Sequence, residues 1–272
     1  MFRGFYTVAS GMLAQQRRTE MLTNNMSNSN TPGFKADQSA MRAFPEMLLE
    51  RVEKDHLGFP QNKTVGPINT GVYMQEAIPK FIQGDLRDTG KKTDMALYDV
   101  SMPVDGETGT PGSVFFTVRQ ADGSLRYTRN GNFTLDGKGF LTTASGEYVL
   151  SSQGNPIQLS SDQFTVSENG VVTGQAGETS QLAIAFAANP NQMIREGNGL
   201  FRTGDGKELP DAAATGGVRF SLKQGSVEQS NVDVSRTMTD MMTAYRAFEA
   251  NQKVMQAYDR SMEKAANEIG RL

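Results

Sequence analysis

The sequence contains no cysteine and no tryptophan, and it has a single histidine, His56. Without cysteine the chain cannot form a disulfide, a thiolate metal site or a cysteine nucleophile. One histidine cannot supply the pair that a His-x-x-x-His zinc site needs, and we interpret His56 as a solvated loop residue. We therefore expect neither a metal centre nor a bound cofactor.

An excess of one charge and long apolar runs are also missing. The 27 Lys and Arg residues nearly balance the 30 Asp and Glu residues, and a net charge of −3 provides no basic surface for nucleic acid. No apolar run reaches the length of about eighteen residues that a transmembrane helix needs, so no direct membrane insertion is expected. Arg3 is not followed by a continuous apolar segment or a small-residue cleavage site, so no secretory signal peptide is expected either.

No catalytic motif is complete. Ser261 and Lys264 have the spacing of a Ser-x-x-Lys motif, but they fall on a predicted helix without any supporting motif. The glycine pairs at 137/139 and 197/199 do not complete a Gly-x-Gly-x-x-Gly loop. Asp105 and Glu107 do not complete a calcium-binding loop. The sequence therefore predicts a protein that is not an enzyme.

The final forty residues carry the clearest periodic pattern. No Gly or Pro occurs between Val232 and Ile269, which favours an uninterrupted helix. Residues along it recur at alternating spacings of three and four, which is typical of a helix that lies along another helix in a shallow left-handed coil. The polar members of this row either fix its register or are solvated where the row opens. The row consists of Met238, Met241, Tyr245, Phe248, Gln252, Met255, Asp259, Met262, Ala266 and Ile269.

The first thirty residues offer a partner for this helix. Their apolar positions share a helical face that is interrupted by a polar stretch. Pro32 disfavours helical geometry at Thr31, so the helix is predicted to end near there. Either the terminal helices pack on the protein's own core, or they pair with each other and with neighbouring subunits. The apolar face consists of Phe2, Phe5, Tyr6, Ala9, Met12, Leu13, Leu22 and Met26.

The region from 81 to 224 is predicted to be β structure. Alternating apolar runs are separated by turn dipeptides that match antiparallel hairpins, and the strands are predicted to form a sandwich or a partial barrel. Near-helical spacing between Ala40 and Glu53, broken by Pro45, predicts a short helix or an irregular segment. The turn dipeptides are Asp122-Gly123, Asn130-Gly131, Asp136-Gly137, Ser145-Gly146 and Asn169-Gly170.

The sequence therefore predicts an α+β chain of four parts. These are an N-terminal helix over 1–30, an extended or irregular connector over 31–80, an antiparallel β domain over 81–225 and a C-terminal helix over 226–272. The two terminal helices are predicted to pair in coiled-coil fashion and to lie side by side.

Two long motifs stand at opposite ends of the chain, one from Asn24 to Lys35 and one from Gly225 to Val234, continued by residues 245–254. Both resemble motifs of the bacterial flagellar axial proteins, the family of rod, hook and hook-associated subunits, and they stand in the family's order. Residues 83–90 and 127–136 are also similar. After Asp94 a Gly-rich stretch replaces the compact turn that the family usually has. The motif positions are Asn24, Asn25, Asn30, Thr31, Pro32, Gly33, Phe34, Ser230, Asn231, Val232 and Asp233.

The resemblance implies a structural subunit of the flagellar basal-body rod, most similar to distal-rod proteins. A hook or proximal-rod subunit is the close alternative, and a β module that binds the cell wall is a more distant one. The implied partners are further copies of itself, other rod and hook subunits, and the flagellar type III export apparatus, which would deliver the chain without cleavage. The implied assembly residues are Phe2, Phe5, Tyr6, Leu13, Leu22, Met26, Met238, Met241, Tyr245, Phe248, Met255, Met262 and Ile269.

Overall fold

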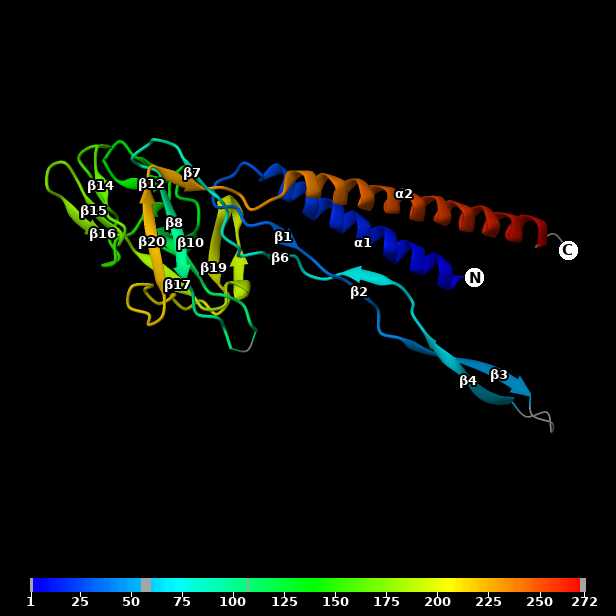
Figure 1. Ribbon diagram of the computed structural model, residues 1–272. Coiled ribbons are helices and arrows are strands. Elements are labelled where there is room, and N and C mark those ends of the chain that lie inside the picture. The colour runs from blue at the N-terminus through cyan, green and yellow to red at the C-terminus, as the bar shows by residue number, and fades with distance from the viewer. Residues whose placement is uncertain (1, 55–59, 107, 270–272) are drawn as a thin grey trace. The chain divides into compact units, whose positions relative to one another are not determined.

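The computed structural model describes residues 2–54, 60–106 and 108–269 (Figure 1). His56 lies outside the described residues. The chain divides into two compact units. The helix-pair unit comprises Met1–Ser27, Asp37–Ile78 and Asp233–Leu272, and the β unit comprises Asn28–Ala36 and Pro79–Val232.

Two long helices dominate the helix-pair unit. Helix α1 spans Phe2–Ser27, and helix α2 spans Val234–Lys264 before a π-helical turn over Ala265–Ile269. Asp233 caps α2, because its side chain accepts a hydrogen bond from the backbone N–H of Arg236 at 3.0 Å. None of the described helices is both long and apolar enough to cross a membrane.

Helices α1 and α2 pack against each other in opposite directions, as Figure 1 shows. Gly4 of α1 lies against the ring of Tyr258, and Gly11 lies against the side chain of Asn251. Further along, Arg18 approaches Asp240 at 3.7 Å. As residue numbers rise along α1 they fall along α2, so the pair is antiparallel.

The segment between α1 and the β unit forms short antiparallel strands. The prediction of a short helix or an irregular segment at 40–53 is wrong, because this stretch contributes to two strand pairs. Phe44 of this stretch stacks on Tyr73, with ring centroids 5.4 Å apart. The pairs are β1 (Asp37–Gln38) with β6 (Ile78–Pro79), β2 (Met41–Ala43) with β5 (Val72–Met74), and β3 (Met47–Lys54) with β4 (Pro60–Ile68).

The β unit is built from several antiparallel sheets. The largest has eight strands: β9 (Ser113–Arg119), β10 (Leu125–Thr128), β11 (Phe133–Leu135), β12 (Leu141–Thr143), β13 (Tyr148–Val149), β17 (Ile184–Ala187), β18 (Met193–Arg195) and β19 (Leu200–Thr203). The other sheets are β14 (Thr165–Val166), β15 (Val171–Thr173) and β16 (Thr179–Gln181); β8 (Met95–Ser101) with β20 (Arg219–Gln224); and β7 (Leu86–Asp88) with β21 (Ser226–Glu228).

Four of the five predicted turn dipeptides connect paired neighbouring strands: β9 to β10, β11 to β12, β12 to β13, and β14 to β15. The hairpin predicted at Asn130-Gly131 is wrong, because β10 and β11 are not neighbours in the sheet. Gly131 instead lies against the backbone of Met95, whose N–H donates to the Gly131 carbonyl at 2.9 Å. A side chain at position 131 would collide with that backbone, so this glycine serves a strand contact and not a hairpin.

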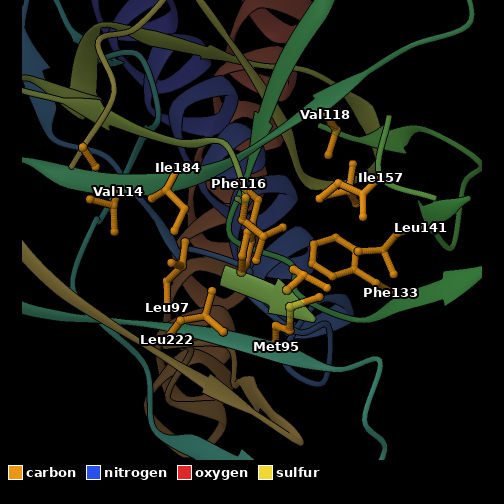
Figure 2. Packing of buried hydrophobic residues seen from close by; sticks show 14 of the residues in the cluster. Met95, Leu97, Val114, Phe116, Val118, Phe133, Leu141, Ile157, Ile184 and Leu222 are labelled. Carbon is orange, nitrogen blue, oxygen red and sulfur yellow. The ribbon is translucent and has the colours of Figure 1, made fainter. Parts of the chain in front are cut away.

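The core of the β unit lies between its sheets (Figure 2). Phe116 of β9 meets Phe133 of β11 edge to face, with ring centroids 5.1 Å apart. Leu97 of β8 and Leu222 of β20 join the same buried cluster. The α+β class is therefore confirmed, and none of the described sheets closes into a barrel.

Candidate assembly surface

One row of α2 residues faces α1, and we call it the packed row. Thr237 and Ala244 are buried, and the other members are half-buried. The spacings alternate between four and three, as a helix that lies along another helix requires. The packed row consists of Thr237, Met241, Ala244, Phe248, Asn251, Met255, Tyr258 and Met262.

The predicted row and the packed row agree at alternate positions only. Met241, Phe248, Met255 and Met262 belong to both. The prediction that Met238, Tyr245 and Ala266 lie in the same row is wrong, because all three are exposed, and the residues before Met238 and Tyr245 face α1 instead. Gln252 and Asp259 are also exposed, which agrees with the alternative that the polar members are solvated. Gly4 lies against the Tyr258 ring and Gly11 against the Asn251 side chain, so at this end of the pair Tyr258 and Asn251 face α1.

The residues of the predicted apolar face of α1 also fall into two groups, one covered and one exposed to solvent. Leu22 is buried, while Phe5 and Met26 are half-buried. Tyr6 and Leu13 point to solvent, with 65% and 55% of their surface exposed. The side chains of Phe2 and Ile269 lie outside the described residues. The helix pair therefore satisfies one face of each helix and leaves other apolar positions uncovered.

A hollow of about 180 Å³ lies where β2 and β5 approach α1. Ser10 joins the two sides, because its hydroxyl donates to the Thr7 carbonyl at 2.8 Å and accepts from the Val72 N–H at 3.3 Å. Sequence reasoning missed this feature, since Val72 of β5 follows Ser10 by 62 residues and only strand pairing brings it there. The hollow is lined by Ser10, Leu13, Ala14, Arg17, Phe44, Val72, Tyr73 and Met74.

The N-terminal motif fixes the chain as it leaves α1. Asn25 is buried, and its side chain both donates to the Asp37 carbonyl and accepts from the Asp37 N–H, each at 2.8 Å. Thr31 follows in a turn, with its N–H bonded to the Asn28 carbonyl at 3.1 Å. Asn24 and Asn30 are exposed.

Gly33 continues the motif inside the β unit. Its φ of +69° and its contact with the Arg129 and Asn130 backbone leave no room for a side chain. Phe34 is buried next to it, beneath the Arg195 guanidinium, which lies 4.7 Å from the ring centroid.

The C-terminal motif meets this segment in the β unit. The Asn231 side chain accepts from the Ala36 N–H at 2.7 Å and donates to the carbonyls of Lys80 and Ile82 at 2.8 and 3.0 Å. Just before it, the Glu228 carbonyl accepts from the Gly33 N–H at 2.8 Å. The two motifs, far apart in sequence, are thus hydrogen-bonded to each other. Ser230 and Val232 interact locally, through a hydroxyl that accepts from the Val232 N–H at 3.4 Å.

A buried charge network holds the two motifs together. Lys35 pairs with one Glu228 oxygen at 2.6 Å, and Arg129 pairs with the other at 2.8 Å. Arg129 also pairs with Asp99 at 2.8 Å. The side chains of Lys35, Arg129 and Glu228 are at most 2% exposed. Glu228 therefore bridges two buried cations from distant parts of the chain.

Backbone groups complete this network. Lys35 donates to the Ile82 carbonyl at 2.8 Å, Glu228 accepts from the Gly84 N–H at 2.9 Å, and Arg129 donates to the Val114 carbonyl at 2.8 Å. This saturation matters, because a buried charge without such partners costs several kcal/mol.

The pKa values of the three buried charged residues are shifted in different directions. Burial, assisted by the nearby Arg129 charge, lowers the pKa of Lys35 to about 8 in spite of Glu228. Burial alone would raise the pKa of Glu228, but Arg129 and Lys35 outweigh it, and the pKa lies below its usual value. Burial likewise opposes the charge on Arg129, but Glu228 and Asp99 outweigh it and raise the pKa of the guanidinium. The network therefore favours the charged forms of Arg129 and Glu228 more than that of Lys35.

These networks carry no grouping that resembles a metal centre. Within the described parts of the chain, no three His, Asp or Glu side chains converge as metal ligands would.

The chain thus has paired terminal helices, and motifs from both ends are joined within its β unit. Three family models match it: flagella basal body rod protein over residues 5–35, flagellar hook protein FlgE/F/G D1 domain over 111–174, and flagellar basal body rod FlgEFG protein C-terminal over 223–268.

Curated relatives match along the whole chain. The flagellar hook-basal body complex protein FlhO of Bacillus subtilis is 49% identical over 272 residues, with 100% of both chains covered. The flagellar basal-body rod protein FlgG of Borreliella burgdorferi is 31% identical, with 98% of each chain covered. FlgG of Bacillus subtilis is 28% identical, with 98% of this chain and 99% of the relative covered. The chain belongs to the family of flagellar basal-body rod and hook proteins.

Proposed function

We propose that this protein is a structural subunit of the flagellar basal-body rod, of the distal-rod type, and that it polymerises through its terminal helices into a tube that transmits torque. One observation supports this most directly: the helix pair leaves a set of large apolar side chains exposed after its internal packing is complete. Relatives of full length that are named rod proteins support the rod in particular.

The pairing of the helices supports a coiled-coil description. The packed row keeps heptad spacing from Thr237 to Met262, and α1 meets it in antiparallel direction. In the β unit, Leu97 and Leu222 share one core with Phe116 and Ile184 of the large sheet, which supports a sandwich of two layers.

The proposed partners are further copies of this chain and other rod and hook subunits. We also propose that the chain is delivered by the flagellar type III export apparatus without cleavage, that it resides in the basal body, and that it has no enzymatic activity. A hook or proximal-rod position is the alternative, and it is supported by FlhO and FlhP, both named hook-basal body complex proteins.

The test is to localise the protein in purified basal bodies and to measure its self-association. We expect antibody labelling on the rod, between the membrane rings and the hook. We also expect a sedimentation coefficient that increases with protein concentration. Labelling of the hook alone would favour the alternative position. Absence from the basal body, combined with a monomer at every concentration, would refute the structural role.

A further inference from the structure

A second apolar face runs along α2 beside the packed row. Val234, Met238, Met242 and Tyr245 are separated by four, four and three residues, so they lie on one side of the helix. Their exposed fractions are 46%, 57%, 50% and 56%. We call these four residues the outer stripe.

The hollow on α1 is a separate surface of the same unit. Leu13, Phe44 and Tyr73 line it and remain exposed, and no residue of the outer stripe contributes to its lining. A chain that carries an apolar stripe and an apolar hollow at different places has the two halves of a head-to-tail contact.

The two helices have matching spacings on these surfaces. On α1, Tyr6, Ser10, Leu13, Arg17 and Glu20 follow one another at four, three, four and three residues. On α2, the row of Ser235, Met238, Met242, Tyr245 and Glu249 is separated by three, four, three and four. Read in opposite directions the two series are identical, and the alternation of three and four is the spacing at which side chains of one helix fit between those of another.

This antiparallel register also brings opposite charges together. With Leu13 opposite Met242, Glu20 lies opposite Ser235 and so beside Arg236, whose side chain is 83% exposed although it lies 4.0 Å from the Asp240 carboxylate. The stem of Arg17 covers Met238, and its guanidinium stays in water. This register therefore combines an apolar contact of Leu13 with Met242 and a pair of opposite charges, Glu20 and Arg236.

From these observations we propose that the outer stripe of one copy seats in the hollow of a second copy of this chain, with Leu13 opposite Met242 and Glu20 beside Arg236. The proposal rests on the proposed function and specifies which faces carry the assembly contact. Each copy would use its stripe toward one neighbour and its hollow toward another. Such head-to-tail contacts extend into a filament when the rotation between copies does not close a ring.

The absence of native cysteine makes crosslinking a direct test. Leu13→Cys and Met242→Cys are introduced into separate full-length chains, which are mixed under oxidising conditions. We expect a disulfide-linked dimer from the mixture and none from either variant alone. Leu13→Cys mixed with Met241→Cys is the matched control, and it should give little product because Met241 is half-buried in the packed row.

Charge exchange provides an independent readout by sedimentation of full-length protein. Glu20→Arg and Arg236→Glu should each weaken self-association several-fold, and the double variant should restore it. Met242→Asp should weaken it at least about tenfold, because a carboxylate would be buried without a partner. All variants should keep the helical circular dichroism of the wild type, since the altered positions face solvent in the isolated chain.

The outcomes separate this proposal from the proposed function. If the wild type self-associates but Met242→Cys gives no more crosslink than Met241→Cys, and Met242→Asp has no effect, the assignment of the faces is wrong while the structural role stands. If the wild type stays monomeric at every concentration, a second copy cannot be the occupant, and the proposal of self-assembly fails with it.

Discussion

The two units of this protein are stabilised in different ways. The β unit buries Phe116, Phe133 and Leu222 with most of the other buried apolar side chains of the described chain. In the described part of the helix-pair unit, the buried apolar side chains are only Ala14, Leu22 and Ala244. A helix owes most of its stability to packing. The β unit therefore has its own buried core, whereas the helix-pair unit leaves large apolar side chains exposed, which supports the proposal that a neighbouring copy covers part of it.

The largest expected effect comes from placing charged residues in the packed row, which should destabilise the helix pair but not the β unit. Phe248→Asp combined with Met255→Asp would place carboxylates between α1 and α2, where burial is strongly disfavoured. We expect loss of most of the helical circular dichroism and of self-association, while thermal unfolding of the β unit shifts little. The control is Met242→Asp, which should leave the helical signal of the monomer intact.

A single cooperative transition at much lower temperature in the Phe248→Asp/Met255→Asp variant would contradict this contrast. It would show that the helix pair and the β unit fold as one body. Unchanged helical signal would contradict the assignment of Phe248 and Met255 to the packed row.

The second expected effect is confined to the β unit. Glu228→Gln would leave Lys35 and Arg129 as buried cations without their shared carboxylate, and removal of one partner of a buried pair costs about 3–5 kcal/mol. Denaturant unfolding should show this loss, while the helical signal at low denaturant is retained. Glu196→Gln is the matched control, because its pairs with Arg126 and Arg202 are partly exposed and such pairs contribute at most about 1 kcal/mol. Equal losses of unfolding free energy in the two variants would show that the buried pairs of Glu228 stabilise the protein no more than the exposed pairs of Glu196.

The third expected effect concerns how closely the two helices approach. A methyl group at Gly4 would collide with the Tyr258 ring, whereas one at Gly11 would lie 3.2 Å from the Asn251 amide, which can turn away. Gly4→Ala should therefore destabilise the helix pair by about 1–3 kcal/mol through overpacking. Gly11→Ala should be neutral or stabilise it by up to about 1 kcal/mol, because alanine favours the helix.

Melting of the helical signal measures both glycine variants. Tyr258→Ala should remove most of the penalty of Gly4→Ala in a double-mutant cycle. If Gly4→Ala proved as stable as Gly11→Ala, the antiparallel contact of Gly4 with Tyr258 would be wrong.

The same two regions show what could be inferred from the sequence. The terminal helices follow from long periodic segments with clear ends, and four hairpins follow from their turn dipeptides. The register of α2 could not be inferred, because a hydrophobic pattern ranks Met238 and Tyr245 above Thr237 and Ala244. The register is set by contact with α1, more than two hundred residues away, as where Gly11 meets Asn251 and Gly4 meets Tyr258.

The buried charge network also could not be predicted from the sequence pattern. Lys35 and Glu228 are separated by 193 residues, and Arg129 reaches Glu228 across 99. Charged residues are usually solvated, so nothing in their local sequence indicates burial. The available signal was their position within or next to the two terminal motifs. The strands of 40–53 were missed because their partners, β4 and β5, lie later in the chain.

The smallest expected effect is the pH dependence of Lys35. Its pKa is about 8 in the folded protein and 10.5 ordinarily, so between these values the unfolded chain binds more protons. Stability contributed through this group therefore rises as pH increases through that window. Lys35→Met lacks the titration. The stability of the wild type relative to Lys35→Met should increase from pH 8 to pH 10.5 in denaturant unfolding, and a constant or falling difference would contradict the lowered pKa.

Hydrogen exchange compared between the monomer and the assembled form tests the central contrast most directly. We predict that amides in residues 6–20 of α1 and 234–249 of α2 gain protection on assembly, because a neighbouring copy covers the hollow and the outer stripe. Strands β9 and β10, already enclosed in the β unit, should exchange at the same rate in both states. Assembly that protects β9 and β10 but leaves residues 234–249 unchanged would contradict the account, because it would place the contact between copies on the β unit.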